Sequence, residues 1–151
     1  MLEDIKNFYR ISDTLATAAQ PTPEHFQDIK DEEFDVVINL AREDSPGAIE
    51  NEEAIVTGFN MDYVHIPVDF EAPALSDLKR FFATMDRYRI NNIFVHCACN
   101  WRVSAFVFLY RTIRCDVPVA IAIRDLHAVW KPDENWQSFI DSVLAHYNID
   151  K

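Results

Sequence analysis

Glycine is almost absent from this sequence. Only Gly47 and Gly58 occur among its 151 residues, which excludes a glycine-rich nucleotide loop of the GxGxxG or GxxxxGK[ST] type. Any tight loop must therefore obtain its positive φ angles from Asn, Asp or a strained residue. Asn and Asp are the residues other than glycine that enter the left-handed region most easily.

Positive charge is also scarce. The chain has 14 Lys and Arg residues against 25 Asp and Glu residues, a formal net charge of −11, and no basic run. Nucleic-acid-binding proteins usually show the opposite balance on at least one face. We therefore expect no nucleic acid and no membrane among the partners, and any anion must be bound by a local cluster of donors.

Cysteine is too rare and too poorly spaced for a disulfide framework or a metal site. The three cysteines are Cys97, Cys99 and Cys115, and no CxxC pair or second pair of ligands accompanies them. The N-terminus carries acids instead of the apolar core of a signal peptide, and no apolar run approaches the roughly 18 residues of a membrane span. We expect a cytoplasmic protein that needs neither a metal nor another cofactor.

What the sequence does contain is an alternation of short apolar runs and amphipathic segments. This pattern is typical of an α/β fold, and the length suits a single domain over residues 1–151 with a mostly parallel central sheet flanked by helices. Strands are predicted at residues 8–11, 35–40, 63–68 and 93–96. Helices are predicted to begin at Thr22, Ser45, Ser76, Val103, Pro118 and Asp133.

The segment that carries chemistry runs from a strand through Cys97 and a four-residue loop to Arg102 and a helix. The strand delivers the cysteine to the carboxyl edge of the sheet, where open α/β folds bind ligands. Loop N–H groups and the helix dipole favour a thiolate, and the planar guanidinium matches two phosphate oxygens. A bare Cys-x4-Arg often occurs by chance, so it is this context that favours a nucleophilic site over a buried structural cysteine.

The segment from His96-Cys97 to Arg102, followed by Phe108–Arg111, resembles the dual-specificity-type cysteine phosphatases. It resembles the bacterial β-lactamase-hydrolase-like phosphatase family more closely. The resemblance extends upstream through Ala18–Thr22, Val37–Leu40 and His65–Asp69. It implies a phosphatase-like fold and metal-independent hydrolysis of a phosphomonoester through a cysteinyl-phosphate intermediate.

The resemblance also assigns roles to residues. Cys97 would be the nucleophile, Arg102 would bind phosphate, and Asp69 would be the general acid, with Glu71 as the alternative. Further phosphate contacts would come from the loop and from the helix that follows it: Ala98, Cys99, Asn100, Trp101 and Ser104. Ser104 is expected to hydrogen-bond the Cys97 thiolate, and His96 to orient the loop.

One departure from the family pattern keeps other functions open. Those phosphatases have five residues with a central glycine between Cys and Arg, whereas this chain has four, with Asn100 expected to supply the left-handed turn. Counted from Cys97 to Arg102 inclusive, the loop has six residues, which is also the length of the active loop in rhodanese-type sulfurtransferases. If this chain were such an enzyme, Cys97 would carry a persulfide. A phosphate-binding module without turnover is the third possibility. The class of phosphorylated substrate is left open.

Arg42 follows the end of the strand predicted at residues 35–40, so it could bind an anion at the same edge of the sheet. As a lone arginine it is expected to lie on the surface instead.

Overall fold

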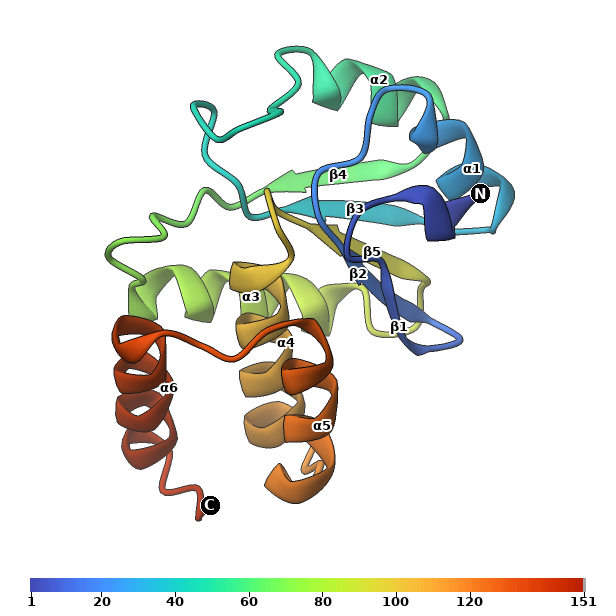
Figure 1. The fold of residues 1–151 in the computed structure, drawn as a ribbon. Coiled ribbons are helices and arrows are strands. Elements are labelled where there is room, and N and C mark those ends of the chain that lie inside the picture. The colour runs from blue at the N-terminus through green and yellow to red at the C-terminus, as the bar shows by residue number, and fades with distance from the viewer. Residues whose placement is uncertain (151) are drawn as a thin grey trace.

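A computed structural model describes residues 1–150 and contains a five-stranded sheet. The strands are β1 (Tyr9–Ser12), β2 (Leu15–Ala18), β3 (Val36–Asn39), β4 (Asp62–His65) and β5 (Ile93–His96). Their order in the sheet is β1-β2-β5-β3-β4 (Figure 1). β1 pairs antiparallel with β2, and all other neighbours are parallel.

Helices cover both faces of this sheet. They are η1 (Leu2–Asp4), α1 (His25–Asp31), α2 (Glu52–Gly58), α3 (Leu75–Arg87), α4 (Trp101–Arg114), α5 (Val119–Val129) and α6 (Glu134–His146). α1 and α2 lie over one face, and the helices from α3 to α6 lie over the other (Figure 1). Each face has its own buried cluster, one including Phe26 and Val56 and the other Phe81, Phe106 and Trp136. The predicted α/β class is confirmed. Within residues 1–150, no helix is long and apolar enough to cross a membrane.

The position of β5 explains why the candidate loop lies at the centre of the molecule. All four residues of β5 are buried, as are those of β3, because parallel strands covered on both faces carry continuous apolar runs. Phe94 of β5 pairs with Ala16 on one side and Val37 on the other. The parallel strands end at one edge of the sheet, so the segments that follow β3, β4 and β5 meet there.

The structure corrects several predicted boundaries. β2 was not predicted, because it is only four residues long and two of them are alanine, so it has no clear apolar strand pattern. The helix predicted from Ser45 begins only at Glu52, and the Ser45 hydroxyl instead accepts a hydrogen bond of 3.1 Å from the Arg42 N–H in a turn. α1 likewise begins at His25 and not after Thr22. Pro118 and Asp133 do cap α5 and α6 as predicted.

Candidate active site

The loop that carries Cys97 joins the central strand directly to a helix. β5 ends at His96 and α4 begins at Trp101, so only residues 97–100 connect them. The N–H groups in the first turn of a helix have no intrahelical partners, and together with the helix dipole they favour negative charge. Cys97 is buried. Because the connection is so short, Cys97 lies close to a helix end that favours a bound anion.

Asn100 provides the left-handed residue of this loop. Its φ angle is 71°, as predicted for a tight loop without glycine. Its side chain, however, is engaged elsewhere, because Nδ2 donates to the Asn7 carbonyl oxygen and to the Thr17 hydroxyl, both at 2.9 Å. Asn100 is fully buried and does not line the pocket described below. Its predicted contact with phosphate can therefore involve only its backbone.

One pocket of about 320 Å³ brings together the three residues with predicted chemistry. Cys97, Asp69 and Arg102 all line it. The other lining residues come from the loop after β5, the start of α4, the segment after β4 and the turn after β3. They are Ala98, Cys99, Trp101, Phe70, Arg42, Asp44, Ser45 and Pro46.

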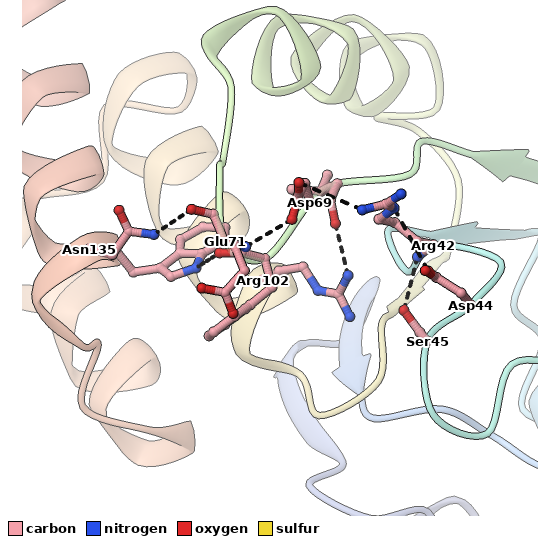
Figure 2. A network of polar contacts seen from close by, with 10 residues as sticks. Arg42, Asp44, Ser45, Asp69, Glu71, Arg102 and Asn135 are labelled. Carbon is pink, nitrogen blue, oxygen red and sulfur yellow. Dashed lines mark hydrogen bonds and ion pairs between the residues drawn. The ribbon is translucent and has the colours of Figure 1, made fainter.

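The guanidinium of Arg102 connects α4 to the segment that bears the candidate acid. Arg102 is only 6% exposed, and its Nη1 donates a hydrogen bond of 2.8 Å to the Val68 carbonyl oxygen (Figure 2). Val68 directly precedes Asp69 in the chain. Arginine has five N–H donors in one plane, so a phosphate can still be bound by the donors that Val68 does not take.

Asp69 lies at this pocket, whereas Glu71 does not line it. The Oδ1 atom of Asp69 accepts a hydrogen bond of 3.0 Å from the Glu71 N–H, which fixes the carboxylate relative to its own loop. The side chain of Glu71 is exposed, and its carbonyl oxygen accepts a hydrogen bond of 3.0 Å from Asn135 Nδ2 (Figure 2). Of the two candidate acids, the geometry favours Asp69.

Arg42 also faces this pocket, although we expected a surface role from the sequence. Its Nη1 lies 3.6 Å from Asp69 Oδ2, and its Nε lies 3.8 Å from Asp44 Oδ1. Figure 2 shows Arg42 with its two carboxylate partners, Asp69 and Asp44. Because Arg42 and Asp69 are each about half exposed, water screens their attraction and the pair contributes little to stability. It nevertheless places a second positive charge at the pocket.

Aromatic side chains form one wall of the pocket. The ring of Phe70, the residue after Asp69, lies 5.8 Å from that of Trp101, centroid to centroid. Trp101 in turn stacks on Trp130, with centroids 5.1 Å apart and an interplanar angle of 7°. Phe70 and Trp101 line the pocket, and we call them the aromatic wall; Trp130 supports the wall from behind Trp101. Trp101 is 38% exposed, so part of its ring is free to contact a ligand.

Comparison with known families decides the reaction class. The sequence model of a family described as a DSP-PTPase phosphatase fused to NAD+ kinase matches residues 6–141, a range that includes Asp69, Cys97 and Arg102. The chain belongs to this family. It is thus a dual-specificity-type cysteine phosphatase, which confirms the resemblance found in the sequence. No curated protein sequence matches the chain.

Solved structures are similar to this phosphatase over nearly its whole length. A DUF442 protein from Shewanella putrefaciens CN-32, described as a candidate phosphatase, is 33% identical with a TM-score of 0.86, covering 97% of this chain and 96% of the other. P. aeruginosa TpbA is 14% identical with a TM-score of 0.72, covering 95% and 91%. PTPMT1 in complex with PI(5)P is 16% identical with a TM-score of 0.75, covering 93% and 98%. At such low identities, the last two show the fold alone.

Ser104 does not take the position predicted for it in this phosphatase. Its hydroxyl donates a hydrogen bond of 3.1 Å to the Trp101 carbonyl oxygen, three residues earlier in α4. It lines a small cavity together with Tyr9 and Thr17, not the pocket of Cys97. A serine within a helix can always donate its hydroxyl to a carbonyl oxygen of the preceding turn. Ser104 does so here, and the predicted hydrogen bond to the Cys97 thiolate is not formed.

A buried carboxylate behind the loop was not foreseen from the sequence. Glu52 is 2% exposed, and its Oε2 lies 2.7 Å from Nε2 of His96, which is fully buried. Burial alone raises the pKa of Glu52, but the charge of His96 and hydrogen bonds from His96, Gln20 and Tyr63 lower it overall. Glu52 stands 44 residues before His96. In the sequence, Glu52 stands beside Glu50 and Glu53, and nothing in the local pattern distinguishes it from these acids. Its burial could therefore not be predicted.

Proposed function

We propose that this protein hydrolyses phosphate monoesters through a cysteinyl-phosphate intermediate. The observation that carries the proposal is that Cys97, Arg102 and Asp69 line one pocket although they come from different segments. Family membership supports the reaction class. The residue roles follow from the chemistry of a thiol, a guanidinium and a carboxyl group around one site.

In the first step, the Cys97 thiolate attacks phosphorus, and the ester P–O bond breaks as the S–P bond forms. Arg102 and the N–H groups of the loop bind the non-bridging oxygens, where negative charge is concentrated. The Asp69 carboxyl group transfers its proton to the leaving oxygen, which departs as an alcohol.

In the second step, water attacks phosphorus and the S–P bond breaks. The Asp69 carboxylate accepts a proton from that water, and Cys97 returns to its thiolate form while inorganic phosphate leaves. Asp69 therefore acts first as an acid and then as a base, which requires one carboxyl group that reaches both oxygens. Asp69 fits this requirement better than Glu71, because Asp69 lines the pocket.

The aromatic wall favours an aryl ester as substrate. A planar leaving group held above Cys97 has the partly exposed ring of Trp101 beside it. A stacked aromatic pair contributes roughly 0.5–1.5 kcal/mol beyond the buried area, so an aryl ester should be preferred about twofold to tenfold over an alkyl ester of similar size. The related folds include TpbA, also solved in complex with pTyr, and PTPMT1, solved with PI(5)P.

Hydrolysis of p-nitrophenyl phosphate in the presence of EDTA tests this function. We expect metal-independent turnover that vanadate blocks and that Cys97→Ser abolishes, because a serine hydroxyl has too high a pKa to ionise in place of the thiol. Cys115→Ser is the matched control. Cys115 is exposed and outside the pocket, so this variant should retain the wild-type rate.

A sulfur-transfer assay provides the opposing measurement, because the short loop also suits a persulfide. Transfer from thiosulfate to cyanide by the same preparation, without phosphate release from any aryl ester, would replace hydrolysis by sulfurtransferase chemistry. Tight phosphate binding with neither activity would leave a binding module. Phosphate release that depends on Cys97 supports the proposal over both.

A further inference from the structure

Glu52 bonds to two residues that adjoin the Cys97 loop from different directions. Its Oε2 pairs with His96 Nε2 at 2.7 Å, and its Oε1 accepts a hydrogen bond of 2.8 Å from Gln20 Nε2. His96 directly precedes Cys97 in the chain. Gln20 reaches the loop through its backbone, because its N–H donates to the Ala98 carbonyl oxygen at 3.3 Å.

Glu52 is buried, whereas the acids next to it in the chain are not. The neighbouring acids Glu50 and Glu53 are exposed, so burial is not a general property of this end of α2. Removing a charged side chain from water is costly unless each of its oxygens is paired, and an apolar residue of similar volume would often stabilise the fold at least as well. Both oxygens of Glu52 are in fact paired with the two residues that adjoin the loop.

We propose that Glu52 is a positioning residue that holds the Cys97 loop through His96 and Gln20. A carboxylate acceptor at Nε2 requires that this nitrogen of His96 carries a proton, which fixes the orientation of the ring. The second oxygen of Glu52 holds Gln20, whose N–H fixes the Ala98 carbonyl group and with it the direction of the neighbouring loop amides. The kinetic part of this inference rests on the proposed phosphatase function, but the part that concerns anion binding does not.

Glu52→Gln is the informative substitution because it changes hydrogen bonding without changing shape. His96 Nε2 and Gln20 Nε2 both donate to position 52. An amide has one accepting oxygen and one donating NH₂ group, so it can accept a hydrogen bond from only one of these two donors. The other partner must then present an acceptor. Either Gln20 rotates its amide and gives up its bond to the Pro21 carbonyl oxygen, or His96 carries its proton on Nδ1, so one of the two supports of the loop changes.

We expect Glu52→Gln to lower kcat/KM for p-nitrophenyl phosphate by about 10- to 100-fold, the usual effect of a small misplacement of catalytic groups. Glu53→Gln removes the same charge from the next, exposed residue of α2 and should change kcat/KM by less than about twofold. The double variant Gln20→Glu with Glu52→Gln should recover most of the loss. In it, the amide at position 52 accepts from His96 and donates to the carboxylate at position 20.

Anion binding supplies a measurement that does not depend on turnover. In the Cys97→Ser background, Glu52→Gln should weaken the binding of inorganic phosphate about tenfold by calorimetry, and the double variant should restore it. If the wild-type protein hydrolyses no ester, the proposed function fails, yet this change in phosphate affinity still supports the role of Glu52.

The inference is overturned if folded Glu52→Gln matches Glu53→Gln in both measurements, or if the double variant is no better than the single one. Should Glu52→Gln fail to fold, Gln20→Ala takes its place. This variant removes the hydrogen bond between the Gln20 side chain and Glu52 but keeps the backbone N–H that donates to the Ala98 carbonyl oxygen. A loss of about threefold to tenfold in phosphate affinity supports the inference, and an unchanged affinity overturns it.

Discussion

The indole N–H of Trp136 donates a hydrogen bond of 2.9 Å to the carbonyl oxygen of Phe70, the residue that follows Asp69. Asn135 makes a parallel bond to the next carbonyl oxygen, that of Glu71 (Figure 2). The first turn of α6 therefore holds two consecutive carbonyl groups, those of Phe70 and Glu71, directly after Asp69. The C-terminal helix thus fixes the backbone from which Asp69 reaches the pocket.

Removing one of these bonds should reduce acid catalysis. Asn135→Ala frees the Glu71 carbonyl oxygen at a cost of about 1 kcal/mol and lets the Asp69 segment move. We expect kcat on an alkyl phosphate to fall about threefold to tenfold, with a smaller effect on an aryl phosphate, whose good leaving group hardly needs a proton. Gln137→Ala is the control on the same helix, because Gln137 bonds the Asp141 carboxylate and not the acid segment. Equal rates for the two variants would show that α6 does not position the acid.

The choice between the two candidate acids can be made directly. Asp69→Asn should slow kcat on an alkyl phosphate by roughly 10²- to 10⁴-fold, because an amide cannot protonate the leaving oxygen. Glu71→Gln should leave this rate within about twofold of wild type, since its side chain is exposed and outside the pocket. Steady-state rates of phosphate release check both values. The reverse result would make Glu71 the acid.

Arg42 should contribute to substrate binding more than to the chemical step. Arg42→Gln removes the half-exposed positive charge beside Asp69, so we expect KM for p-nitrophenyl phosphate to rise about threefold to tenfold while kcat changes less. The difference between wild type and variant should shrink in high salt, which screens exposed charges. Arg80→Gln on α3 is the control, because Arg80 pairs with Asp77 outside the pocket. An unchanged KM in low salt would show that Arg42 pairs with Asp69 and Asp44 but does not bind the substrate.

The buried pair of Glu52 and His96 predicts how stability responds to acid. The pKa of Glu52 is lowered below its ordinary value of 4.5, so the pair stabilises the folded state above that pH, and this stabilisation is lost as the pH falls through the lowered pKa. At pH 7, Glu52→Gln should be less stable than wild type by about 1–3 kcal/mol, because a buried donor loses its acceptor. This difference should shrink as the pH falls below 4.5.

Urea unfolding at neutral and acidic pH measures that change. Glu53→Gln serves as the control, since its exposed charge should shift stability only slightly at either pH. A Glu52→Gln deficit that stays constant down to pH 3 would mean that the carboxylate contributes through its shape and not through its charge.

Several parts of the site were readable from the sequence because they depend on residues close together in the chain. A strand, Cys97, a short loop and a helix place Arg102 beside the thiol by geometry alone. The shortage of glycine predicted a left-handed Asn100, and its φ angle of 71° agrees. Asp69 follows a parallel strand, and parallel strands end at one edge of the sheet, so its place at the pocket could also be predicted.

Only the tertiary structure decided the rest, because those contacts join segments that no local pattern connects. Glu52 lies 44 residues from His96 in the chain, and burial among residues of other elements converts an ordinary surface acid into a partner of the loop. Arg42 faces the pocket from the turn after β3, where its N–H bonds the Ser45 hydroxyl. Trp136 meets Phe70 from 66 residues away. Local spacing determined the candidate nucleophile and its loop, whereas the contacts that support this loop and the candidate acid were determined by how distant segments pack.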